Sequence, residues 1–145
     1  MTTVENRTQT PVPGQSPVPG LLDALREAEA DFRRSYARVL AVVAQLDAEK
    51  VGAVAGFGTT ARLLAGVLNL SKGEATARVE QAGALTPRQS LTGEALPPLL
   101  PATAAELAAG TIGPAHVRVI TATLRRIPTS LHPGVVADAE QTLRA

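Results

Sequence analysis

From residue 21 to residue 49, large apolar side chains recur at steps of three and four, with charged side chains between them. This spacing gathers the apolar groups on one face of an α-helix. The series is Leu25, Ala28, Phe32, Tyr36, Val39, Val43 and Leu46. We expect one long amphipathic helix that packs within the domain or pairs with a second copy. Internal packing is favoured, because the stripe is about three and a half heptads long and lacks clear charge complementarity along its flanks.

The rest of the chain is also expected to be helical. Its apolar residues are mainly Ala, Leu and Val, with two Phe, one Tyr and no Trp. Ala and Leu are strong helix formers, whereas the aromatic residues that favour a sheet are scarce. The sequence therefore predicts an all-α fold, in which the long helix precedes about five shorter helices arranged in hairpins.

The first residues have a different character, with four prolines among Thr, Gln, Ser and Gly. Such a segment buries too little apolar surface to offset the entropy lost on ordering. We expect a disordered tail over residues 1–20 and a helical domain over residues 21–145. The last predicted helix is still amphipathic at Ala145, which indicates a truncated domain, because boundaries normally fall in polar linkers.

Capping signals divide the region after the long helix. Thr59 or the residue after it can cap a helix that ends near Leu68. Ser71 and Glu74 form a capping box, in which the hydroxyl and the carboxylate each accept a backbone N–H, for a helix that runs to about Ala84. A helical hairpin is therefore expected here.

The second half of the chain carries similar signals. Residues 86–101 are rich in Gly and Pro, which predicts a loop. Thr103 and Glu106 form a second capping box, for a helix that Gly110 closes. Two prolines suited to the first helical position start the last two helices, Pro114 and Pro133.

Charge and cysteine content restrict the class of protein. Fourteen Lys and Arg against thirteen Asp and Glu give a net charge of +1, well below the excess typical of a dedicated nucleic-acid binder. The absence of cysteine excludes disulfides and Cys-ligated zinc, and it fits a reducing compartment. No signal peptide or membrane span is recognisable, so we expect a cytoplasmic protein without a membrane partner.

Residues suited to catalysis are few. The two histidines, His116 and His132, have no second histidine or carboxylate at the spacing of a helical metal site. Each is expected to face solvent or to accept an ordinary hydrogen bond. No nucleophile elbow, phosphate-binding loop or dinucleotide fingerprint is present. We therefore expect no enzymatic activity, metal, cofactor or small-molecule ligand.

The hairpin over residues 60–84 also has the outline of a helix-turn-helix reader of DNA. Its second helix exposes basic and acidic side chains whose charges cancel, whereas a recognition helix should attract phosphates. A later helix carries the most basic local run, although cations near a helix end also complement its dipole. The candidate DNA contacts are Arg62, Lys72, Arg78, Arg118, Arg125 and Arg126.

Two signatures occur in a characteristic order. The first contains GTTARLLA at residues 58–65, LNLSKGEA at 68–75 and RVEQA at 78–82; the second contains LPATA at 100–104 and HVRVI at 116–120. Together they resemble the helical N-terminal domain of the actinobacterial 13E12 repeat family. The resemblance covers residues 21–145.

This resemblance implies a domain of unknown function that usually precedes an HNH endonuclease in proteins associated with mobile or repeated DNA. The nuclease segment is absent from the sequence, so none of its catalytic residues can be placed here. We expect a non-catalytic helical accessory module, from a truncated copy, that assists DNA association or positions the nuclease. The alternative is a self-associating scaffold with no nucleic-acid role, a homodimer through the helix at residues 21–49.

Overall fold

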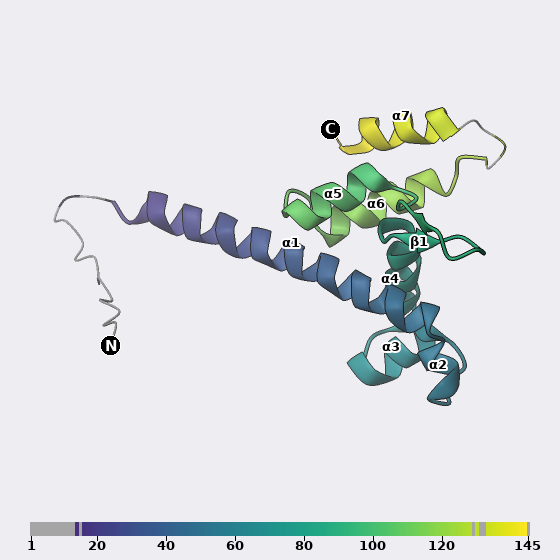
Figure 1. The fold of residues 1–145 in the computed structure, drawn as a ribbon. Coiled ribbons are helices and arrows are strands. Elements are labelled where there is room, and N and C mark those ends of the chain that lie inside the picture. The colour runs from purple at the N-terminus through teal and green to yellow at the C-terminus, as the bar shows by residue number, and fades with distance from the viewer. Residues whose placement is uncertain (1–13, 15, 129, 131–132, 145) are drawn as a thin grey trace, which may run out of the picture.

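The computed structural model describes residue 14, residues 16–128, residue 130 and residues 133–144. In this part of the chain the fold is helical, as the sequence predicts, and it also contains one two-stranded sheet that the sequence does not predict (Figure 1). In chain order the elements are α1 (Val18–Ala48), α2 (Val51–Val54), α3 (Thr60–Leu68), α4 (Lys72–Leu85), β1 (Arg88–Gln89), β2 (Ala95–Leu96), α5 (Pro101–Ala109), α6 (Pro114–Leu124) and α7 (Pro133–Arg144).

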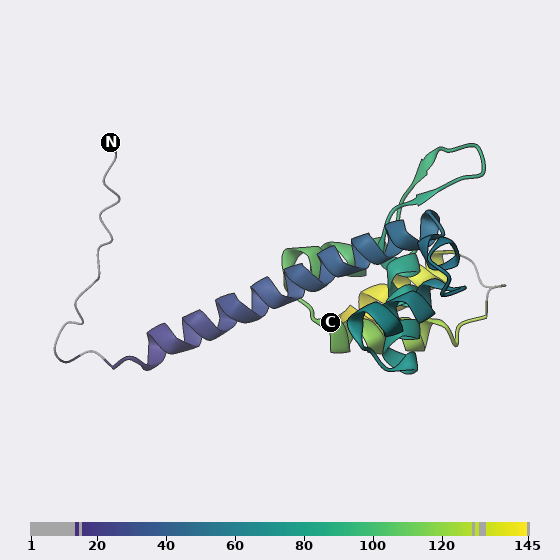
Figure 2. The same ribbon diagram turned by 90° about the horizontal axis from the view of Figure 1, so that it is seen from below.

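The long helix α1 begins at Val18, before the expected start at Leu21. Pro17 occupies the cap position and Pro19 lies in the first turn, where a missing N–H costs nothing because that group has no intrahelical partner. The end of the predicted disordered tail is therefore helical, and residues 1–13 lie outside the described residues. Every residue of α1 from Val18 to Glu29 is exposed, and Figures 1 and 2 show this half projecting beyond the other helices.

The helical hairpin α3–α4 forms as predicted from its caps. Thr59 accepts the N–H of Arg62 through its hydroxyl, and Asn69 ends α3 with a left-handed φ of 53°. Ser71 accepts the N–H of Glu74 at 3.2 Å and so caps α4. Only half of that capping box forms, because the Glu74 carboxylate is held by arginine side chains.

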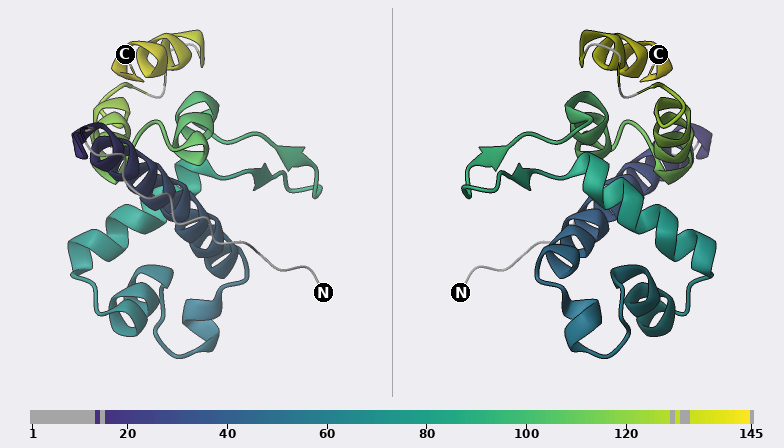
Figure 3. Two further views of the ribbon diagram at one scale, coloured as in Figure 1. Left: turned by 90° about the vertical axis from the view of Figure 1, so that its left-hand side faces the viewer. Right: turned by 90° about the vertical axis from the view of Figure 1, so that its right-hand side faces the viewer.

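The connection between α4 and α5 was predicted to be a loop, and this prediction is wrong in part. Strands β1 and β2 pair antiparallel, with Arg88 opposite Leu96 and Gln89 opposite Ala95. Gly93, with φ of +84°, lies in the turn that joins them. Figure 3 shows the hairpin extending away from the helices. The hairpin cannot be recognised from the sequence, because each strand is only two residues long and has no alternating apolar pattern.

The predicted capping box of Thr103 and Glu106 is also wrong. Helix α5 begins at Pro101, so Thr103 lies inside its first turn and is fully buried. Its backbone N–H and its hydroxyl both donate to Glu140 of α7, at 2.6 and 2.7 Å. A partner distant in sequence therefore replaces the expected local Glu106, which no reading of a four-residue motif could identify.

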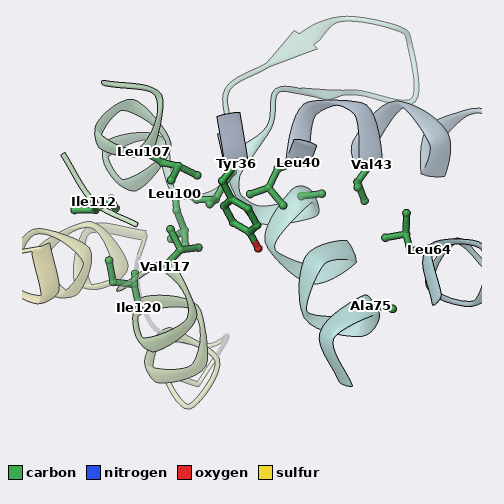
Figure 4. Packing of buried hydrophobic residues seen from close by; sticks show 12 residues of the cluster. Tyr36, Leu40, Val43, Leu64, Ala75, Leu100, Leu107, Ile112, Val117 and Ile120 are labelled. Carbon is green, nitrogen blue, oxygen red and sulfur yellow. The ribbon is translucent and has the colours of Figure 1, made fainter. Parts of the chain in front are cut away.

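The core lies where α1, α4, α5 and α6 meet (Figure 4). Tyr36, Leu40 and Val43 of α1 point into it, and small side chains of α4 let the two helices approach closely. The other large members are Leu64 of α3, Leu85 of α4, Leu107 of α5, Val117 and Ile120 of α6, and Leu100 and Ile112, which lie on either side of α5. No described helix combines the length and apolar character that a membrane crossing requires.

Candidate functional site

A hollow of about 800 Å³ lies between α4 and α6 and contains Arg118 and Arg125. The carboxylate of Glu74 lies at one end of it. Its Oε1 accepts from Nε of Arg78 at 3.3 Å, and its Oε2 accepts from Nη2 of Arg118 at 2.5 Å. Further along, Glu80 accepts from Nη1 of Arg125 at 2.8 Å. Three of the predicted DNA contacts are thus already paired with carboxylates of α4.

The charges around Glu74 also show in its pKa. Burial is the largest single influence and would raise it, but hydrogen bonds from Arg118 and Arg78, together with their positive charges, leave the pKa of Glu74 below its ordinary value. Arg78 also lies over the ring of Tyr36, 5.8 Å from its centre. Burial raises the pKa of Tyr36, and its hydroxyl donates to Gln81 at 2.5 Å. These groups act as a polar link between α1, α4 and α6.

The other predicted DNA contacts are differently placed. Arg62 and Lys72 line one hollow between α3 and α4, about 510 Å³ in volume, and Lys72 also borders the hollow between α4 and α6. Arg126 lies beyond the end of α6 and lines neither hollow. Within the described ranges none of these three side chains forms an ion pair. The six candidates therefore do not form one basic surface. Of the six, only Arg62 and Lys72 line the same hollow without an ion pair to a carboxylate.

A second surface is apolar and lies between α1 and α3. We call it the α1–α3 groove; its volume is about 610 Å³. Val67 is 66% exposed and Val42 is 55% exposed, although both are aliphatic. Its walls include Val39, Val42 and Leu46 of α1 and Leu63, Val67 and Leu68 of α3. The sequence pattern alone does not mark the α3 members as exposed, because a short apolar helix is normally buried.

The apolar surface continues along the projecting half of α1. Leu21 and Leu25 are each 66% exposed, and Phe32 is 55% exposed. With Ala28, Ser35, Val39, Val42 and Leu46 they recur at steps of three and four and therefore share one side of the helix. We call this series the outer stripe. Internal packing of the predicted stripe is therefore confirmed for Tyr36 and Val43, which are buried, and is wrong for Leu25 and Phe32, which are exposed.

The two ionisable clusters near the C-terminus hold helices together. Glu140 is 3% exposed and binds Thr103, while Arg144 donates to Glu106 at 2.8 Å. His116 bonds the carbonyl of Leu143 through Nε2 at 3.2 Å, so it is hydrogen-bonded as predicted. His132 lies outside the described residues. Within the described residues no three His, Cys, Asp or Glu side chains gather as metal ligands.

Comparison with known proteins gives a family and no activity. The profile of a family described as "Domain of unknown function (DUF222)" matches residues 22–145. An uncharacterized protein of Mycobacterium tuberculosis is 38% identical over 130 residues, which cover 87% of this chain and 28% of that protein. An uncharacterized Mycobacterium bovis protein is 36% identical over 125 residues, covering 86% of this chain and 27% of its own length.

Another uncharacterized M. tuberculosis protein is 42% identical over 107 residues, covering 74% of this chain and 48% of its own length. The chain therefore spans less than half of each of these relatives. No solved structure matches this chain.

Proposed function

This chain belongs to the DUF222 family, a domain of unknown function, and on that premise we propose that it is a non-catalytic helical module that joins two copies of its protein. The single observation that carries the proposal is the outer stripe, which continues from the projecting half of α1 into the α1–α3 groove. Large apolar side chains exposed next to one another on a protein surface commonly mark an interaction site.

The projecting half of α1 supports the same proposal. Isolated helices shorter than about 12–15 residues are marginal in water, and most helical stability in proteins comes from packing an apolar face. From Val18 to Glu29 α1 has no such packing within the described chain. A second helix against its outer stripe would supply it.

The module would act on whatever its protein carries elsewhere. The M. tuberculosis and M. bovis relatives are much longer than the region they share with this chain. Joining two modules would bring their remaining parts together in pairs. If the HNH nuclease implied by the 13E12 resemblance is among those parts, pairing would place two nuclease sites on one DNA.

Sedimentation equilibrium of the purified chain tests the proposal. We expect a mass of twice the 14.9 kDa of one chain at concentrations of tens of micromolar. Leu25→Lys should return it to one chain mass, because Lys retains helix propensity but places a charge in the stripe. The matched control is Leu91→Lys, at a fully exposed position of the β-hairpin. A wild-type chain that stays monomeric at hundreds of micromolar contradicts the proposal.

A second candidate function, DNA association, is favoured by one observation, the unneutralised neighbours Arg62 and Lys72. Their side chains are free to bind phosphate, unlike Arg118 and Arg125. Fluorescence anisotropy with duplex DNA over a salt series tests it. Lys72→Ala should weaken binding and lower the salt slope by roughly one, whereas Arg26→Ala, which removes the same charge from α1, should not. No binding even at low ionic strength removes this candidate.

A further inference from the structure

We infer that two copies pair through antiparallel α1 helices, so that the projecting half of each lies in the α1–α3 groove of the other. This inference rests on the proposed self-association and specifies its geometry. The supporting observation is that the 31-residue helix α1 is complementary to itself. Its first half exposes apolar side chains, and its second half borders the apolar α1–α3 groove.

The spacing of the outer stripe fits this arrangement. When two identical helices run antiparallel, facing residues have numbers that add to a constant. The register that places Leu25 opposite Val42 therefore also places Leu21 opposite Leu46. The same register places Ala28 opposite Val39 and Phe32 opposite Ser35. All but the last pair are apolar on both sides, and the two Phe32 rings meet beside the two-fold axis.

The space around α1 distinguishes this pairing from a parallel one. Alongside the second half of α1, the walls of the groove are formed by Val67 and Leu68 of α3. In a parallel pair the two grooves would face each other and the two bare halves would face each other, so neither groove would receive a bare half. In the antiparallel pair the groove receives residues 18–29, which no other described element covers. Only the antiparallel pair places the bare half of each α1 against the groove of the other copy.

Charge complementarity appears only in the antiparallel register. Asp31 and Arg38 occupy the same flank of the outer stripe, one heptad apart. In the proposed register Asp31 of one copy lies beside Arg38 of the other, and the symmetry produces this pair twice. Among the described residues of one chain, Arg38 donates only to the hydroxyl of Ser35, and Asp31 pairs with Arg34. In a parallel pair the neighbours of Asp31 and Arg38 across the seam are Tyr36 and Val43, which offer no opposite charge.

Disulfide crosslinking tests the register, because the chain has no native cysteine. We expect a mixture of Leu25→Cys and Val42→Cys chains to form a mixed disulfide under mild oxidation. Neither variant alone should crosslink, because its two cysteines lie about 25 Å apart along the antiparallel pair. The control mixture is Leu25→Cys with Leu91→Cys, which should not crosslink.

Charge exchange gives an independent readout. Asp31→Arg and Arg38→Asp should each raise the dimer Kd roughly tenfold, because each change creates like-charge neighbours at two symmetric positions. The double variant should restore a Kd close to that of the wild type. A change that harmed only the fold of one chain would not be rescued in this way.

The outcomes separate the inference from the function on which it rests. A mixed disulfide together with charge rescue supports the antiparallel register. A dimer in which Leu25→Cys crosslinks to itself, or in which the charge exchange is not rescued, overturns the register and leaves self-association standing. A wild-type chain that is monomeric by sedimentation overturns both, and the outer stripe then belongs to contacts with other parts of the longer protein.

Discussion

Glu140 of α7 accepts two hydrogen bonds from Thr103 of α5. The backbone N–H of Thr103 donates at 2.6 Å and the Thr103 hydroxyl donates at 2.7 Å. Both residues are buried. The carboxylate satisfies an N–H of the first turn of α5, which has no partner within its own helix, and its charge complements the dipole there. This contact attaches the last described helix to the body of the domain.

Removing that acceptor should destabilise the protein. Glu140→Ala leaves the hydroxyl and N–H of Thr103 unpaired in the interior, and we expect a loss of about 2–4 kcal/mol in the free energy of unfolding. Glu140→Gln retains an acceptor oxygen and should lose less. Urea unfolding followed by circular dichroism measures both. Glu94→Ala, at an exposed hairpin position, should change little, and equal losses at the two sites would contradict the role of Glu140.

Gly110 ends α5 where that helix meets α1. Its φ is +82°, and a Cβ added there would lie 2.9 Å from the carbonyl oxygen of Ala30. Gly110→Ala should therefore cost more than the roughly 1 kcal/mol expected for a left-handed φ alone. Gly93→Ala separates the two effects, since Gly93 has φ of +84° with nothing within 4 Å. Thermal unfolding should show the larger loss for Gly110→Ala, and equal shifts would contradict close packing at this point.

Acid should weaken the link at Glu74. Because its pKa is lower in the folded chain than its ordinary value of 4.5, the folded state binds fewer protons than the unfolded state in that range. The stabilisation is therefore complete above pH 4.5 and is lost as the pH falls through the lowered value. Glu74→Gln should lower the free energy of unfolding at pH 7 and have less effect at pH 3.

Urea unfolding at the two pH values measures this difference. The control is Glu27→Gln, which removes an α1 carboxylate that has no ion pair among the described residues. If Glu74→Gln has the same effect at both pH values, the ion pairs with Arg78 and Arg118 do not stabilise the fold.

Much of the fold follows from local signals in the sequence. Thr59, Ser71, Gly110 and Pro114 cap or start helices as predicted, because each signal depends on the backbone within a few residues. The capping box at Thr103 misleads, because the fold supplies a stronger acceptor from Glu140. Local reasoning cannot rank a neighbour against a partner that folding brings close.

The candidate site was less predictable than the fold. Arg118 and Arg125 look available for DNA in the sequence, and only the packing of α6 on α4 shows that Glu74 and Glu80 bind them. For the outer stripe the sequence errs in the other direction, since residues that look buried are exposed. Its periodicity is plain, but α1 has a second apolar side that includes Leu40, and which side the core covers depends on where the later helices pack.

The most direct test of self-association through α1 is amide hydrogen exchange of residues 18–29, measured at two protein concentrations. Pairing should protect these amides, so their exchange should slow as the concentration rises, while amides of the buried segment around Val117 and Ile120 should not respond. Fast exchange of residues 18–29 that does not change with concentration would contradict the account.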